Sequence, residues 1–101
     1  FTVAADKLIK VNRMTVANVD GSSAATFNLY IDTGAQTSSG GTVASGAADI
    51  YLAKTVSVPA DSTLVVVDTP IYLRETDVLK GGASASGDLD LFMSYEVLDD
   101  A

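Results

Sequence analysis

The stretch Asp88-Leu89-Asp90-Leu91-Phe92-Met93-Ser94-Tyr95-Glu96-Val97 decides the fold of this chain. Large apolar side chains occupy every second position from Leu89 to Val97. Because successive side chains of a strand point to opposite faces, this alternation predicts a β-strand with one buried face. The pattern places Leu91 and Tyr95 against the core and Ser94 on the opposite face.

Upstream, residues 25–31 repeat this alternation. We expect the first set of side chains to point inward and the second to point outward: Ala25, Phe27, Leu29 and Ile31, against Thr26, Asn28 and Tyr30. The alternation again predicts a strand that packs one face on the core.

A third predicted strand, residues 8–18, changes phase in its middle. Ile9 and Val11 share one parity, whereas Met14 and Val16 have the other. A β-bulge near Asn12-Arg13 adds one residue and would return both pairs to the same face. We therefore expect one long strand interrupted by a bulge.

Shorter segments complete the pattern. The continuous apolar run 64–67 predicts a strand covered on both faces. Further short strands are expected at 50–53, 56–58, 71–73 and 77–79. Turn signals separate them: an Asp-Gly hairpin signal in 19–23, a proline turn at 59–62, and a link framed by 81–82 and 86–88.

Short strands with frequent turns and no amphipathic helix are typical of an all-β fold. We predict an antiparallel two-sheet sandwich, jelly-roll or immunoglobulin-like, with about eight short strands in one domain over residues 1–101. The 12 valines, 4 isoleucines and 10 threonines favour strands as well.

Composition excludes several classes of function. The chain has no cysteine and no histidine, so Ser-His-Asp and Cys-His catalysis are excluded, as is the commonest transition-metal ligand. Thirteen acidic residues face six basic ones, and the net charge of −7 repels nucleic acid. No apolar run approaches the roughly 20 residues that span a bilayer. We expect no enzyme activity, no cofactor, no nucleic-acid partner and no membrane partner. Initiator methionine is not normally removed before phenylalanine, so the sequence leaves open whether residues precede Phe1.

Residues 33–48 differ from the rest of the chain. They consist of glycine, serine, threonine and alanine, with Gln36 and Val43 the only larger side chains. A loop of this length in a small domain is uncommon and is typically functional or disordered. Two hypotheses stay open, a floppy hairpin tip and a loop that a partner orders on contact.

The charge is distributed unevenly along the chain. Residues 1–60 have no net charge, whereas residues 61–101 hold nine acids and two bases. This distribution is compatible with a solvated acidic face. It is also compatible with an oriented module whose contact surface draws on Lys7, Lys10 and Arg13 with Gln36 and Val43 of the loop, while the acidic C-terminal strand stays in solvent.

Two short motifs are candidates for a catalytic site and for a metal site. Tyr30-Ile31-Asp32-Thr33-Gly34-Ala35 resembles the active-site motif of the retroviral-type aspartic proteases, which are dimers in which two carboxylates share a proton. The same residues also fit an ordinary turn after a strand. For calcium, Asn18 to Gly21 has part of a loop spacing without the downstream bidentate acid, so we predict no metal site.

Aromatic residues are expected on the faces opposite the core, namely Tyr30, Tyr51 and Phe92. Exposed aromatics flanked by small polar residues are typical of protein interfaces. A position under the long loop or on the second sheet is the alternative.

Two stretches together resemble the small accessory proteins of tailed-bacteriophage virions. The first is Ile9-Lys10-Val11-Asn12-Arg13-Met14-Thr15-Val16-Ala17-Asn18. The second runs from Val56-Ser57-Val58-Pro59-Ala60-Asp61-Ser62-Thr63-Leu64 through Ile71-Tyr72-Leu73 and Thr76-Asp77-Val78-Leu79 to Ser94-Tyr95-Glu96-Val97. Many relatives have Gly-Asp where this chain has Thr76-Asp77.

The resemblance implies a β-sandwich that decorates or cements the capsid, with no catalytic residue. On this basis we expect a structural virion protein that binds the major capsid protein at the capsid surface as a homo-oligomer, with a trimer as the first expectation. Alternatives are a tail, neck or baseplate component, the dimeric aspartic protease, and a carbohydrate-binding sandwich, which the lack of tryptophan disfavours.

Overall fold

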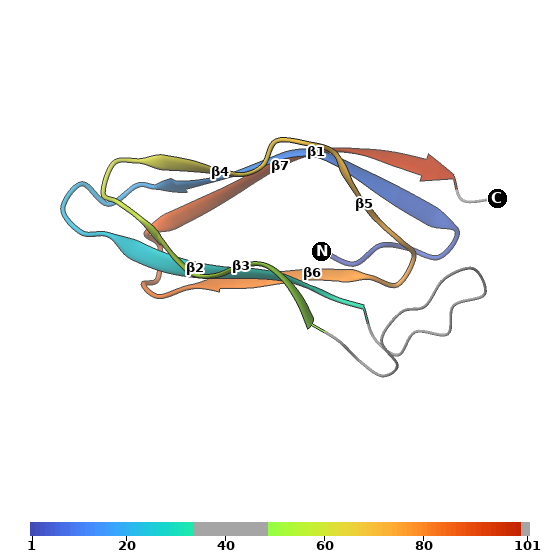
Figure 1. Ribbon diagram of the computed structural model, residues 1–101, viewed down its shortest axis with the longest axis horizontal. Helices are drawn as coiled ribbons and strands as arrows, with labels where there is room; N and C mark the ends of the chain where they lie inside the picture. The colour runs from blue at the N-terminus through green and yellow to red at the C-terminus, as the bar shows by residue number, and fades with distance from the viewer. Residues whose placement is uncertain (34–48, 100–101) are drawn as a thin grey trace.

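The computed structural model describes residues 1–33 and 49–99, and there it forms two antiparallel sheets packed face to face (Figure 1). The first sheet contains β1 (Lys7–Asn18), β4 (Thr63–Val67), β5 (Ile71–Leu73) and β7 (Leu89–Asp99). The second sheet contains β2 (Ala25–Asp32), β3 (Asp49–Val58) and β6 (Val78–Ala83). The predicted all-β sandwich is confirmed, with seven strands in the described ranges instead of about eight.

β1 is the central strand of the first sheet. β7 pairs with it along its whole length, from Lys7 opposite Asp99 to Asn18 opposite Leu89. The other edge of β1 pairs with β4 at residues 14–17 and with β5 at residues 9–11. The β1–β7 register shifts between Val11 and Arg13, which confirms the bulge expected at Asn12-Arg13.

β2 is the central strand of the second sheet, between β3 and β6. The β2–β3 register shifts on both sides of Leu29, and Thr55 of β3 has a positive φ of 51°. β3 therefore runs as one irregular strand from residue 49 to 58, where the sequence predicted two separate short strands. The β2–β6 register is regular from Phe27 opposite Ala83 to Asp32 opposite Val78.

The core lies between the two sheets and is built from alternate residues of the long strands. On β1 and β2 these are the predicted inward side chains, so the facing predicted from their alternation is confirmed. Met14 and Val11 have no exposed surface. Other buried members include Val3, Ile9, Val16, Phe27, Leu29, Val58, Leu73 and Leu79.

Two turn predictions are wrong in the same way, because tertiary contacts decide which strands pair. Residues 19–24 do not close a hairpin, since β1 and β2 belong to different sheets and the segment crosses between them. Gly81-Gly82 lies inside β6 and is not a link. The proline turn at 59–62 is confirmed, with the Ser62 N–H donating to the Pro59 carbonyl at 3.2 Å.

The crossing at residues 19–24 is organised by Asn18, which is 3% exposed. Its Nδ2 donates to the Ser23 and Val58 carbonyls at 3.0 and 2.9 Å, and its Oδ1 accepts from the Asp20 N–H at 2.9 Å. One amide side chain thus satisfies three backbone groups where β1 leaves the first sheet.

β4 was predicted to be covered on both faces, and this is wrong. Leu64 and Val67 stand opposite the buried Val16 and Met14 of β1, whereas Val65 stands opposite Thr15 and is 41% exposed, because the β1–β4 register shifts between Val65 and Val67. A two-layer sandwich covers only one face of each sheet, so the alternate side chains of an apolar strand face solvent. Gln36 and Val43, with nearly all of the predicted contact loop, lie outside the described residues.

Candidate functional site: the open side of the sandwich

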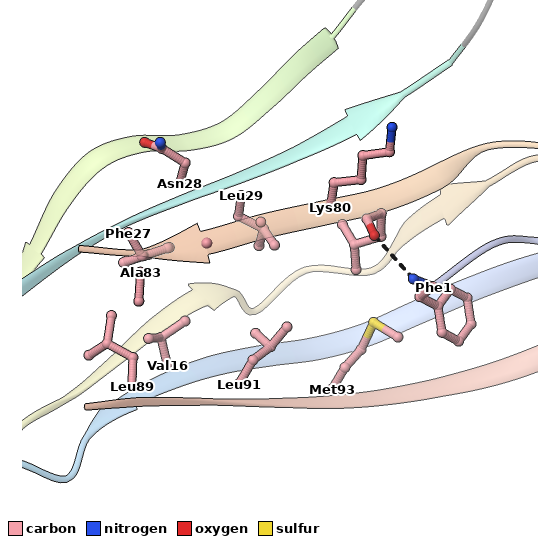
Figure 2. A pocket seen from close by; sticks show the side chains of 13 residues that line it. Phe1, Val16, Phe27, Asn28, Leu29, Lys80, Ala83, Leu89, Leu91 and Met93 are labelled. Carbon is pink, nitrogen blue, oxygen red and sulfur yellow. Dashed lines mark hydrogen bonds between the residues drawn. The ribbon is translucent and has the colours of Figure 1, made fainter. Parts of the chain in front are cut away.

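An apolar cleft of about 400 Å³ opens between the two sheets where β6 and β7 lie on the same side of the sandwich. Figure 2 shows side chains of β6 and β2 on one wall and those of β7 and β1 on the other, with Phe1 at one end. Leu89, Leu91 and Met93 of β7 point into this cleft.

The cleft results from small residues at the inner positions of β6. Leu79 is buried in the core, but the next two positions of the same parity are Gly81 and Ala83. A Cβ added to Gly81 would lie 2.6 Å from the Asn28 carbonyl oxygen, so the backbone of β6 lies close to β2 at this point. Large side chains of β7 therefore face a wall that has almost no side chains to fill the space.

The N-terminal residues pair with the free edge of β6 at the end of the cleft. The Phe1 ammonium group donates to the Leu79 carbonyl at 3.2 Å, and the Leu79 N–H donates back to the Phe1 carbonyl at 2.8 Å. Val3 bonds in the same way with residues 76 and 77, and its side chain is 2% exposed. The Phe1 ring packs edge to face against Tyr95. Residues 1–3 therefore close one end of the open side and leave the edge at 81–83 uncovered.

β7 faces the predicted way but is not buried as predicted. Leu91 and Tyr95 stand opposite Val16 and Val11 of β1, which are buried, so both point to the inner face. Even so, Leu91 is 50% and Tyr95 44% exposed. The prediction that they are core residues is wrong, because the β6 wall opposite them is short and small. Val97 on the same face, and Phe92 and Leu98 on the outer face, are exposed as well.

Charges along β1 and β7 offset one another. Lys7 forms an ion pair with Asp99, and Lys10 stands directly opposite Glu96. The hydrogen bond between the first two lowers the pKa of Asp99 below its ordinary value and raises the pKa of Lys7 above its own. The basic segment predicted to contact a partner is therefore not separated in space from the acidic strand predicted to face solvent, and which of them binds a partner stays a prediction. The two are neighbouring strands of one sheet.

Of the residues predicted to contact a partner, three lie in the described part of the chain. Lys7, Lys10 and Arg13 lie together on β1, with Arg13 exposed opposite Ser94. Their role in binding a partner stays a prediction. Sequence reasoning missed Phe1 and the small inner residues Gly81 and Ala83. The run Gly81-Gly82-Ala83 after Lys80 is the available signal, although glycine pairs are also typical of links between strands.

Asp32 is the last residue of β2, the central strand of the second sheet, and pairs with Asp49 of β3 and Val78 of β6. Its carboxylate accepts a hydrogen bond from Lys80 of β6 at 2.9 Å, and this bond raises the pKa of Lys80. An aspartic-protease pair holds one shared proton between two carboxylates. In this structure the Asp32 carboxylate is paired with the Lys80 ammonium group.

The outer aromatics lie where the sequence places them. Tyr30 and Tyr51 are cross-strand neighbours on the second sheet, with ring centroids 5.1 Å apart, and Lys54 Nζ lies 5.1 Å from the Tyr51 ring centroid. Phe92 is 68% exposed on the first sheet. These aromatics therefore lie on opposite outer faces and do not form one joint patch.

Within residues 1–33 and 49–99, no cluster of three or more acidic side chains is arranged to hold a metal ion. The same ranges include no helix that could span a membrane. Comparisons with protein-family models, with curated proteins and with solved structures find no match to this chain.

Proposed function

We propose that this chain is a structural protein of a tailed-phage virion, a capsid decoration or cement protein that binds the major capsid protein. The proposal rests on the sequence resemblance described above and on one structural observation. A single strand, β7, exposes five large apolar side chains: Leu91, Phe92, Tyr95, Val97 and Leu98.

This exposure supports an assembly role because apolar side chains in contact with water are unfavourable for an isolated protein. Contiguous apolar patches beyond a few hundred Å² are rare on monomers and mark interaction surfaces. Long, exposed apolar edge strands also promote uncontrolled association. In a protein that functions within an assembly, a partner subunit can cover such a strand.

The chemistry of the described residues supports a binding role over catalysis. The cleft is lined almost entirely by apolar side chains, with Lys80 as its one charged lining residue. A binding protein of this kind stabilises a shell by mass action, because it binds the assembled lattice and not the free subunits.

The direct test is to locate the protein on particles. Antibodies raised against the purified chain are applied to virions of the phage that encodes it, and gold labels are mapped by electron microscopy. Labels over the head surface are the expected result. Labels at the neck, tail or baseplate would replace decoration by the alternative virion role, and virions that carry no copy of the chain would refute the proposal.

A second measurement tests stabilisation. Heads produced without the protein are heated with and without purified protein added back, and release of DNA is followed with an intercalating dye. We expect added protein to raise the release temperature. Bovine serum albumin at equal concentration serves as the control, and an equal effect of both proteins would contradict specific cementing.

A further inference from the structure

We propose that two copies of this chain form a two-fold dimer by antiparallel pairing of β7 with β7 of the second copy. The inference goes beyond the proposed function, since it concerns self-association and holds wherever the protein acts. It rests on the free edge of β7, on the charge pattern along that strand, and on the cleft beside it.

β7 has a long free edge. In the described residues it pairs only with β1, so one row of backbone groups along its eleven residues has no strand beside it. The edge strands β3, β4, β5 and β6 have features that natural sheets use to prevent pairing with another chain. β4 and β5 are short, β3 is irregular around Thr55, and residues 1–3 cover the first part of β6. β7 has no proline, no lysine and no bulge of its own.

The sequence of β7 is self-complementary in one register. In a two-fold pair that keeps both inner faces on one side, opposite residues have the same parity. With the axis at Ser94, Leu91 meets Val97 and Met93 meets Tyr95 of the second copy. Each of these inner-face pairs is apolar on both sides, which is the pairing that stabilises neighbouring strands.

The same register also keeps like charges apart on the outer face. Asp90 stands opposite Leu98, and Phe92 opposite Glu96. Moving the axis one residue toward the N-terminus places Asp90 directly opposite Glu96, and like charges in that position are destabilising. The register centred on Ser94 has one mixed inner-face pair, Leu89 with Asp99 at the ends of the strand. Moving the axis one residue toward the C-terminus pairs Asp99 with Leu91 instead, so Leu91 loses its apolar partner Val97. Charge and apolar pairing therefore select Ser94 as the centre.

The dimer also covers the cleft. Leu91 and Met93 line its mouth, and in this register Val97 and Tyr95 of the second copy stand beside them. Because the contact is isologous, each copy covers the cleft of the other. The exposed inner-face side chains of β7, Leu91, Tyr95 and Val97, gain apolar neighbours from the second copy that a monomer does not provide.

The oligomeric state is measured by analytical ultracentrifugation of the full chain across micromolar concentrations. We expect a species of twice the 10.4 kDa chain mass. A monomer at roughly 100 µM, far above the range of specific dimers, would overturn the proposal, and so would the trimer expected from the family resemblance.

Cross-linking tests the register. The chain has no cysteine, so Ser94→Cys introduces the only thiol and places it opposite its own copy at the axis. Under mild oxidation we expect a disulfide-linked dimer. Ser57→Cys, an exposed serine on the edge strand β3, is the matched control and should stay largely monomeric on reducing-agent-free gels. Equal cross-linking of both variants would overturn the register.

Charge variants at Phe92 test the cross-strand pair independently. Phe92→Glu places like charges opposite Glu96 at both symmetric positions, so the dimer should weaken by about tenfold or more. Phe92→Lys should leave dimerisation intact or tighten it, and Phe92→Glu combined with Glu96→Lys should restore it. Tyr72→Glu, also at an exposed aromatic of the first sheet, is the control and should leave dimerisation unchanged.

Circular dichroism checks that each variant retains the β spectrum of the parent chain. Phe92 is 68% exposed, so its replacement leaves the core intact. Equal dimerisation of the Phe92→Glu and Phe92→Lys variants would overturn the proposal. Loss of dimerisation without loss of virion binding would separate this inference from the proposed function.

Discussion

The rings of Phe1 and Tyr95 meet edge to face, with centroids 5.2 Å apart and planes at 76°. The first residue is hydrogen-bonded to β6 of one sheet, and Tyr95 belongs to β7 of the other. This contact therefore joins the two sheets across the open side, at the end of the cleft. Elsewhere on that side the two sheets do not make such a contact, because the inner face of β6 has only the small residues Gly81 and Ala83 there.

A double-mutant cycle measures this contact. The variants Phe1→Ala and Tyr95→Ala, singly and together, should show a coupling free energy of about 0.5–1.5 kcal/mol, as aromatic pairs do. Urea denaturation reports the free energy of unfolding of each variant. The pair Phe1→Ala with Tyr72→Ala, on another strand, is the control and should be additive within the error. Additivity of the first pair would show that the ring contact contributes nothing.

Gly81 and Gly82 should respond oppositely to alanine. A Cβ at Gly81 would lie 2.6 Å from the backbone oxygen of Asn28, so either β6 or β2 must shift. We expect Gly81→Ala to destabilise the protein by about 1–3 kcal/mol, the usual cost of overpacking. Gly82→Ala meets nothing within 4 Å and should be neutral or slightly stabilising. Thermal unfolding compares the two, and equal effects would contradict the close approach of β6 to β2.

Asn18 should be the most sensitive polar residue of the described core. Asn18→Ala removes three hydrogen bonds and leaves buried backbone groups without partners. The expected loss is roughly 2–4 kcal/mol in the free energy of unfolding. Asn12→Ala is the matched control, because that side chain has only a long 3.4 Å bond to Glu96 and should cost less than about 1 kcal/mol. Similar losses for both would show that the buried network is not important.

Acid should weaken the turn at Asp20. The Ser22 backbone N–H and hydroxyl both donate to its carboxylate at 2.9 Å, and the backbone bond is the main cause of a pKa below the ordinary value. A lowered folded pKa gives stability that is present above the unfolded value of about 3.9 and is lost as the pH falls through the folded value.

We therefore expect the denaturation midpoint to fall between pH 6 and pH 2.5, and to fall less in Asp20→Asn. Asp90→Asn changes an exposed carboxyl that accepts no hydrogen bond from the described residues, and it controls for the general effect of removing an acid. An equal fall in the parent chain and in Asp20→Asn would contradict a role for the Ser22 hydrogen bonds.

Alternation along the chain was sufficient to predict the long strands and their facing. The bulge in β1 was predicted at the correct place, because the change of parity between Val11 and Met14 is a local property of the sequence. The irregular course of β3 was not predicted. Its irregularity consists of shifts in its pairing register with β2 on both sides of Leu29, and a pairing register is not a property of one segment alone. For the candidate site, none of the residues that line the cleft was proposed as a site residue.

Alternation, with the bulge at Asn12-Arg13, determined from the sequence alone which side of β1, β2 and β7 each residue occupies, because successive side chains of a regular strand point to opposite faces. Only the tertiary structure decided which of those sides are buried. Leu91 has the parity of a core residue and still is half exposed, since burial depends on what stands opposite, and here that is Gly81 and Ala83. It also decided that Lys7 meets Asp99, 92 positions away, so that the basic and acidic ends of the chain form one neutral pair of strands. Pairing between distant strands is a cooperative outcome of the whole core, and no local pattern contains it.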